Sequence, residues 1–495
     1  MIVMKFGGTS VQDAAAMERV IEIVRSRRER QPVVVLSALA GTTDALQRCA
    51  EEAHRGRERE ALQLLEDGIV VRHREVVEGL LQDPMQRRLL LDSLEKHFQE
   101  VRMLLRGLAI LGELTPRSLD TVLAYGERLS TLIATAAMQE RGLPACWLDA
   151  RELLVTDEQF TQATPLPAES AERVEKYLKP LLRDGAKIPV TQGFVGATPD
   201  GRTTTLGRGG SDYSAAILGA LLDAEEIEIW TDVDGVMTAD PRVVPEARTI
   251  RELSYTEAAE LSYFGAKVLH PKTIRPAIER GIPLRILNTF NPEAPGTRIV
   301  RESAREPRTV KAITAIKDLS LINVEGRGML GVPGVAARVF TAVARERINV
   351  LMISQSSSEQ SICFIVEATA AEGALRALRE AFERELEKRL IDRISAQDDV
   401  AIVAVVGAGM RGTPGIGAKV FRALGEAQIN VISIAQGSSE HNLSLVVARG
   451  DADEAVRAIH KEFRLEEPYD TNDPAGAART GRRGPGARTT DSANP

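Results

Sequence analysis

The sequence has few cysteines, no long hydrophobic run and no excess of basic residues. Its three cysteines (Cys49, Cys146 and Cys363) lie far apart without C-x-x-C spacing, which excludes a disulfide framework or a zinc cluster. No run approaches 18 apolar residues, and no basic segment precedes a short apolar one, so neither a membrane span nor a signal peptide is expected. The net charge of −7 is opposite in sign to that of a typical nucleic-acid-binding protein. These absences predict a cytoplasmic protein with no nucleic-acid or membrane partner.

The length and the order of apolar runs predict several domains, the first of them α/β. At 495 residues the chain is too long for one hydrophobic core, and about three domains are expected. Over residues 1–300, short β-branched runs alternate with helical patterns, which favours a mostly parallel central sheet with helices on both faces. Residues 44–141 carry no strand signal and predict a helical excursion within this domain. The expected strands are Ile2–Phe6, Val33–Ser37, Ala145–Leu148, Ile188–Thr191, Glu226–Thr231 and Leu284–Asn288.

The second half of the chain contains an internal repeat. Residues rich in proline and charge follow Asn291, and a linker is expected over 301–317. Beyond it, glycine and glutamine positions recur at a constant offset of 81 residues, as in Gly334 and Gly415 (415 − 334 = 81). Residues 318–395 and 398–465 therefore predict two α+β units of ferredoxin-like type. Residues 466–495 contain almost no large apolar side chains and are expected to be disordered.

The first strand leads directly into Lys5 and the pair Gly7 and Gly8. Apolar residues at helical spacing follow from Val11 to Arg28, so the glycines are expected at a helix N-terminus. Free backbone N–H groups beside a lysine suit a polyphosphate. The alternative is an ordinary strand–helix turn that needs glycine for its backbone alone.

A second candidate anion site lies in residues 201–212 (GRTTTLGRGGSD). This segment places Arg208, several threonines and a glycine pair before a helix expected at Tyr213–Leu222. Arginine and the free N–H groups of a helix N-terminus both favour anions. For Asp212 alone, the alternative is a residue placed at the helix start by its favourable interaction with the helix dipole.

Two further segments suit a nucleotide. Residues 228–242 (EIWTDVDGVMTADPR) end a strand at Thr231 and Asp232, and ligands bind at the carboxyl ends of strands in open α/β sheets. The Asp234-Gly235 pair within this segment is read as a turn. In residues 264–271 (FGAKVLHP), Lys267 stands near a glycine ahead of another helix, where it could meet a phosphate or a base.

Four motifs, in this order and followed by two repeats, resemble the aspartate kinases. They are KFGGTS (5–10), GRGGSDYS (207–214), WTDVDG (230–235) and FGAKVLHP (264–271). The resemblance extends to about residue 465 and implies an amino-acid-kinase fold followed by two ACT domains. In this family the first strand of the second ACT domain precedes the first ACT domain, and Val310–Ile316 would be that strand.

The resemblance implies transfer of the ATP γ-phosphoryl group to the side-chain carboxylate of L-aspartate. The product, 4-phospho-L-aspartate, is the first intermediate toward lysine, threonine, methionine and isoleucine. Phosphoryl transfer depends mainly on positioning and charge stabilisation, so the absence of a nucleophile motif is consistent with it. Mg²⁺ would be held mainly by the nucleotide phosphates, and no protein metal ligands are predicted.

Residue roles follow from the same resemblance. Lys5 would neutralise the transferred phosphoryl group, Asp212 would orient Lys5, and Arg208 would clamp an aspartate carboxylate. Glu127 would meet the α-ammonium group of the substrate. Met237 replaces a tyrosine common in the family and can still cover the base. The ATP-binding set is Lys5, Phe6, Gly7, Gly8, Thr231, Asp232, Met237, Arg242, Lys267 and Val268, and the aspartate-binding set is Ser37, Thr43, Glu127, Arg208 and Ser211.

The ACT repeats are most similar to those of bifunctional aspartokinase–homoserine dehydrogenases, which favours threonine as a feedback inhibitor. The catalytic motifs are equally similar to those of lysine-sensitive monofunctional enzymes, so lysine is the alternative. The expected effector-binding residues are Asn349, Gln355, Asn430 and Gln436, although each asparagine could instead serve a turn.

Two other functions are less consistent with the sequence. A kinase for glutamate or acetylglutamate is disfavoured by the KFGGTS start and by the paired ACT units. A catalytically inactive amino-acid sensor is disfavoured because Lys5, Arg208 and Asp212 are all present. The sheet edges of paired ACT units predict a homo-oligomer, a dimer or a tetramer.

Overall fold

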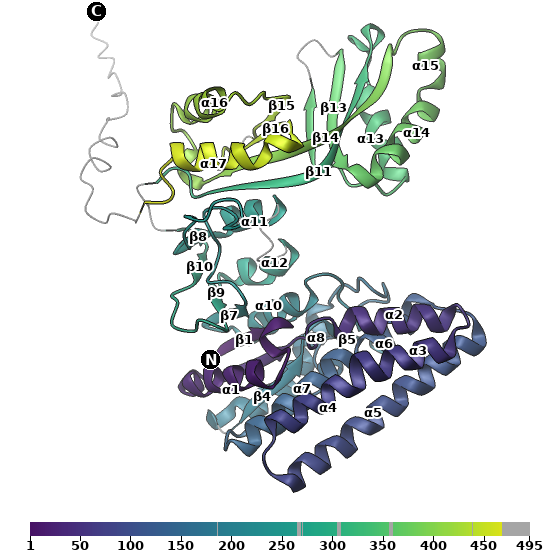
Figure 1. Ribbon diagram of the computed structural model, residues 1–495, viewed down its shortest axis with the longest axis vertical. Helices are drawn as coiled ribbons and strands as arrows, with labels where there is room; N and C mark the ends of the chain where they lie inside the picture. Colours follow the sequence, from purple (N-terminus) through teal and green to yellow (C-terminus); the bar gives the residue numbers. More distant parts are fainter. Residues whose placement is uncertain are drawn as a thin grey trace, which may run out of the picture. The chain divides into compact units, whose positions relative to one another are not determined.

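The chain folds into two compact units, drawn in Figure 1. The computed structural model describes residues 1–185, 187–264, 269, 271–303, 308–355, 360–437 and 439–467. The first unit contains residues 1–237 and 249–303, and the second contains residues 238–248 and those from 304 onward. The expected tail, 466–495, lies outside the described residues except for Glu466 and Glu467. No helix among the described residues is long and apolar enough to cross a membrane.

The first unit is built on an eight-stranded sheet. Its strand order is β3-β4-β2-β1-β7-β9-β10-β8, and all neighbours are parallel except β9 and β10. The mostly parallel sheet is confirmed, and all six expected strands are present within one residue. A separate hairpin is formed by β5 and β6. The bounds are β1 Ile2–Phe6, β2 Pro32–Leu36, β3 Ala145–Leu148, β4 Ile188–Gln192, β5 Val195–Ala197, β6 Thr203–Thr205, β7 Glu226–Thr231, β8 Glu252–Ser254, β9 Leu284–Asn288 and β10 Thr297–Val300.

Helices cover both faces of this sheet, so its central strands β1, β2 and β7 are almost entirely buried. On β1, Ile2, Met4 and Phe6 pack into one core with residues of α1 and α7. The helix α10 contacts β1 and β7 but adds nothing to that core, because it lies on the other face. Lys5 alternates with these apolar residues and therefore points to the side of α10.

The residues of the expected helical excursion form the helices α2 to α7. Its longest helix, α5, begins at Pro84 because Asp83 accepts a hydrogen bond from the Met85 N–H group at 2.8 Å. The same helix ends where Gly112 adopts a left-handed conformation with φ of 65°. The helices of the first unit are α1 Ala14–Ser26, α2 Thr42–His54, α3 Glu58–Leu65, α4 Val71–Leu80, α5 Pro84–Leu111, α6 Pro116–Leu123, α7 Tyr125–Glu140, α8 Pro167–Arg173, α9 Lys179–Leu182, α10 Gly210–Leu222, α11 Tyr255–Tyr263 and α12 Pro271–Arg280.

Two helix starts differ from expectation, and for α1 local capping explains the difference. The glycine pair leads into a short 3₁₀ turn at Thr9–Val11, and α1 begins only at Ala14, where the Asp13 side chain accepts from Ala16 N at 2.8 Å. The expectation that the pair directly starts a long helix was therefore wrong. The later helix α10 begins earlier than predicted, at Gly210, so Asp212 falls in its first turn.

The second unit contains a six-stranded antiparallel sheet in the order β12-β13-β11-β14-β16-β15. Two strands of 14 residues each, β11 and β14, lie at its centre. Residues 312–316 of β11 pair with β14 alone, whereas residues 319–325 pair with β13 and β14. The strands are β11 Ala312–Glu325, β12 Met352–Gln355, β13 Ser361–Glu367, β14 Arg393–Val406, β15 Ser433–Ala435 and β16 Asn442–Ala448; the helices are α13 Val335–Arg345, α14 Ala371–Ala381, α15 Glu383–Glu387, α16 Ile416–Glu426 and α17 Ala452–Glu462.

Residues 238–248 leave the first unit and pack into the second. Ala239 and Val244 belong to the same hydrophobic core as Val420 and Ile459. The Ile313 N–H group donates to the Thr238 carbonyl at 2.8 Å. Sequence periodicity offered no sign of this exchange, because it depends on contacts with residues far along the chain.

Candidate active site

Lys5 and Asp212 lie together at the carboxyl edge of the central sheet. Lys5 stands one residue before the end of β1, and its Nζ is 2.6 Å from Oδ1 of Asp212 in the first turn of α10. Lys5 is 8% exposed, so water screens this ion pair only weakly. The KFGGTS and GRGGSDYS segments, which lie about two hundred residues apart in the sequence, therefore meet at this ion pair.

The glycine pair forms a narrow backbone cradle beside this ion pair. The Gly7 N–H group donates to the Trp230 carbonyl at 3.1 Å, which joins the end of β1 to the end of β7. A Cβ at Gly8 would lie 3.0 Å from the Ala38 carbonyl oxygen, so only glycine fits there without a shift. A Cβ at Gly7 would lie 3.6 Å from Lys5 Nζ. A ligand group beside Lys5 thus meets main chain rather than side chains.

Phe6 does not offer its side chain to a ligand. Its ring is fully buried and stacks on the Trp230 ring with centroids 5.8 Å apart. Only its backbone can therefore contribute to the predicted nucleotide site, and its carbonyl already accepts from Ser37 N at 3.1 Å.

Glu127, near the start of α7, is a buried carboxylate without a cation among the described residues. It is 3% exposed; Oε1 accepts from Ala38 N at 3.3 Å, while Oε2 has no hydrogen-bond partner. Burial raises the pKa of Glu127 to about 8. Ser130 Oγ, on the next turn, donates to the Ser37 carbonyl at 2.8 Å, so the predicted residues Ser37 and Glu127 lie side by side. A cation would satisfy this carboxylate.

The loop that carries Arg208 is held by close backbone packing. Gly207 and Gly209, on either side of Arg208, adopt left-handed conformations with φ of 75° and 73°. A Cβ at Gly193 would lie 2.5 Å from the Ser211 Cβ, so the first turn of α10 rests directly on the end of β4. The Arg208 side chain is exposed and forms no ion pair with the described residues, which leaves its guanidinium available.

Thr43 has a less defined place. It stands half-buried in the first turn of α2, and its neighbour Thr42 contacts the Gly126 position that precedes Glu127.

The predicted nucleotide-binding residues are divided between the two units. Thr231 and Asp232 lie at the end of β7, where Thr231 Oγ1 donates to Asp232 Oδ1 at 3.1 Å. Met237 follows in the first unit, but Arg242 belongs to the second, where it pairs with Asp240 at 2.6 Å. Lys267 and Val268 lie outside the described residues.

Sequence reasoning missed a hydroxyl pair that braces the same edge. Ser10 Oγ and Thr289 Oγ1 are 2.7 Å apart, and both residues are fully buried. Their separation of 279 positions in the sequence leaves no local signal that could have predicted this contact.

The described residues contain no group of three or more histidine, cysteine or carboxylate side chains placed to hold a metal ion. Backbone amides, one lysine and one aspartate suit a metal that arrives with polyphosphate, since Mg²⁺ is commonly bound through substrate phosphates and one or two carboxylates.

The second unit holds a cavity of about 270 Å³ at the start of α13. Of the four predicted effector residues, all of which are exposed, Gln355 lines this cavity and Asn349, Asn430 and Gln436 do not. The remaining lining residues are Met329, Gly331, Val332, Pro333, Gly334, Val335, Ala336 and Ile362.

Comparisons with known proteins agree with this architecture. The model of the amino acid kinase family matches residues 1–288, and an ACT domain model matches 322–382 and 403–463. The lysine-sensitive aspartokinase 3 of Escherichia coli is 35% identical over 463 residues, covering 94% of this chain and 99% of the relative. The bifunctional aspartokinase/homoserine dehydrogenase 1 of Arabidopsis thaliana is 40% identical over 470 residues. That match covers 94% of this chain but only 51% of the length of the relative.

A solved structure supports the same relationship. The crystal structure of E. coli aspartokinase III with aspartate and ADP matches with a TM-score of 0.78 and 35% identity, over 93% of this chain and 99% of the other. An amino acid kinase domain followed by two ACT domains is the domain order of this chain. The chain belongs to the aspartokinases.

Proposed function

We propose that this protein transfers the γ-phosphoryl group of ATP to the side-chain carboxylate of L-aspartate, giving 4-phospho-L-aspartate. The observation that carries the proposal is the Lys5–Asp212 pair of 2.6 Å, set beside a glycine cradle and close to the uncompensated carboxylate of Glu127. One side of this site suits a phosphate and the other suits an ammonium group. The reaction would be the first step toward lysine, threonine, methionine and isoleucine.

Lys5 would act on the migrating phosphoryl group. Negative charge on the equatorial phosphoryl oxygens needs a fixed cation, and a buried ammonium group costs no reorganisation when the reaction occurs. Asp212 holds this ammonium group in place at 2.6 Å. The backbone near Gly7 and Gly8 would receive the phosphate chain, with Thr231, Asp232 and Met237 toward the nucleoside and Arg242, Lys267 and Val268 as further expected contacts. Mg²⁺, bound through the nucleotide, would supply additional charge neutralisation.

Glu127 would bind the α-ammonium group of aspartate. An ammonium group would satisfy the unpaired Oε2 and would compensate a carboxylate that burial otherwise keeps protonated. Arg208 would clamp a substrate carboxylate, bidentately where the geometry allows. Ser37, Thr43 and Ser211 would complete the aspartate site.

The direct test is ATP-dependent formation of the acyl hydroxamate from aspartate, with glutamate and acetylglutamate as controls. Activity with aspartate at least tenfold above that with either control is expected. Equal activity with glutamate would favour the alternative, another amino-acid kinase.

We also propose feedback inhibition by threonine through the cavity at Gln355. Among the described residues, its lining includes no carboxylate, so a lysine ammonium group would enter without a counter-charge there, whereas a methyl and a hydroxyl suit the apolar wall. The first turn of α13 can accept the effector carboxylate. Titration of threonine and lysine against activity distinguishes the two, and insensitivity to both would remove the regulatory proposal.

The remaining expectations are part of the same proposal. Three free cysteines favour a reducing, cytoplasmic setting. Self-association into a dimer or tetramer is expected through the sheet edges of the ACT pair.

A further inference from the structure

Asp120, in α6, is a buried carboxylate that no cation pairs with in the described part of the chain. It is fully buried, yet three donors from elsewhere in the chain converge on it. Its Oδ2 accepts from Thr205 N at 3.0 Å and from Thr161 N at 2.9 Å, and Oδ1 accepts from Thr205 Oγ1 at 2.6 Å. Burial raises the pKa of this carboxyl group, and the three hydrogen bonds oppose that rise. Such a group is costly to bury, so it calls for an explanation beyond helix formation.

The donors lie on the two segments that support the Arg208 loop. Thr205 is the last residue of β6, three positions before Arg208. Thr161 is a non-glycine residue with φ of 69°, a strained conformation that its surroundings must maintain. Its carbonyl oxygen would lie 3.0 Å from a Cβ at Gly207, so the Thr161 backbone is packed against the residue preceding Arg208.

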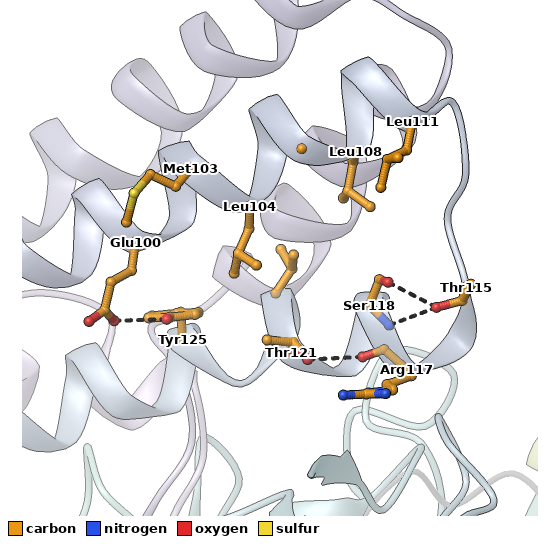
Figure 2. A pocket seen from close by; sticks show the side chains of 12 residues that line it. Glu100, Met103, Leu104, Leu108, Leu111, Thr115, Arg117, Ser118, Thr121 and Tyr125 are labelled. Atoms are coloured by element: carbon orange, nitrogen blue, oxygen red, sulfur yellow. Dashed lines mark hydrogen bonds between the residues drawn. The ribbon is translucent and has the colours of Figure 1, made fainter.

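The side of α6 that faces α5 borders an open cavity, while Val122 and Leu123 belong to the core of the first unit. Thr121, Val122 and Ser118 face a cavity of about 690 Å³ that separates α6 from Leu104 and Leu108 of α5, as Figure 2 shows. A helix with open space along one side is poorly constrained by packing there. The hydrogen bonds of Asp120 to Thr205 link α6 directly to the β5–β6 hairpin.

We infer that Asp120 is a positioning residue: it fixes the backbone that presents Arg208 to the aspartate carboxylate. This role rests on the proposed function. The Asp120 carboxylate does not touch the substrate in this account; it sets where the Arg208 loop begins.

The test is steady-state kinetics of Asp120→Asn. The asparagine is isosteric, but its amide NH₂ faces donors that need an acceptor, so at least one of the three contacts is lost. We expect the KM for aspartate to rise about ten- to a hundredfold, the scale of one lost hydrogen bond to a charged group, while the KM for ATP stays within about twofold. Thr205→Val removes only the hydroxyl donor and should raise the same KM less, and Thr205→Ser should restore it.

Glu257→Gln is the matched control. Glu257 is also fully buried, and its Oε2 accepts from Ser254 N at 2.8 Å in the capping box of α11. It should lower the melting temperature without changing the KM for aspartate. If Asp120→Asn and Thr205→Val lower the melting temperature but leave this KM unchanged, the residue is only structural and the inference is overturned. Wild-type protein is assayed first, since failure to phosphorylate aspartate there would refute the proposed function itself.

Discussion

Aspartate binding should release a proton from Glu127. In the free protein the pKa of this buried carboxyl group is about 8, so at pH 7 about 0.9 of the molecules carry it protonated. An α-ammonium group placed against Oε2 favours the ionised form and returns the pKa toward its usual range. Each bound aspartate should therefore release about 0.9 proton at pH 7 and about 0.1 at pH 9.

The sign of the pH dependence follows. Below pH 8 the protein must give up the Glu127 proton before it can bind the ammonium group, so affinity should rise about tenfold per pH unit between pH 6 and pH 7. Above pH 8 the curve should flatten. Isothermal titration calorimetry at pH 7 in two buffers with different ionisation enthalpies measures the proton count directly.

The variant Glu127→Gln provides the control. It should abolish the proton release and the pH dependence, and it should weaken aspartate binding by about 2–3 kcal/mol, the scale of a lost charge-assisted contact. A wild-type dissociation constant that is flat from pH 6 to pH 8, with no buffer-dependent heat, would refute the assignment of Glu127 to the ammonium group.

Three further predictions address packing, stability and regulation. Gly193→Ala places a Cβ 2.5 Å from the Ser211 side chain and should raise the KM for aspartate about tenfold, because it displaces the first turn of α10. In the control Gly107→Ala the new Cβ meets nothing within 4 Å, so the kinetics should stay unchanged and α5 should be stabilised by about 1 kcal/mol. Equal kinetics in both variants would contradict the packing argument. Burial lowers the pKa of His73 from 6.5 to about 4, so as the pH falls the imidazole is protonated first in the unfolded chain. The contribution of His73 to the free energy of unfolding should be fully present above pH 6.5 and should fall by about 3 kcal/mol toward pH 4. Urea unfolding at several pH values measures this slope, and His73→Leu should reduce it. Gln355→Ala should raise the threonine concentration for half-inhibition about tenfold, because Gln355 lines the cavity. Gln436→Ala, outside the cavity, should change this concentration little. A larger effect of Gln436→Ala than of Gln355→Ala would place the effector elsewhere.

The strands of the first unit were predictable because buried strands of a parallel sheet are rich in consecutive apolar residues. Parallel strands covered on both faces leave short apolar runs such as Val33–Val35, and Ile2–Phe6 is apolar except for Lys5. The exact start of α1 was not predictable from periodicity, since Val11 fits the helical pattern and only the Asp13 cap decides the boundary. The short strand Thr203–Thr205 was read as a ligand-binding run alone, although it also forms a hairpin with β5.

The candidate site was predictable to the extent that its residues belong to recognisable motifs. Lys5, Asp212 and Glu127 came from motifs and do lie near one another through contacts with the ends of β1 and β2. Asp120 carries no motif and sits at an ordinary polar position of a short helix, so its role depends on distances to Thr161 and Thr205 that only the fold supplies. Arg242 differs from these residues: the family resemblance assigned it to the same nucleotide site as Thr231, whereas its contacts place it in the second unit.

The most direct test of the whole account is the turnover of Lys5→Ala. If the Lys5 ammonium group, held by Asp212 at 2.6 Å, neutralises the transferred phosphoryl group, kcat for aspartate phosphorylation should fall by about a hundredfold or more, with threonine binding at the second unit retained. A Lys5→Ala protein that turns over within about threefold of wild type would contradict the central claim.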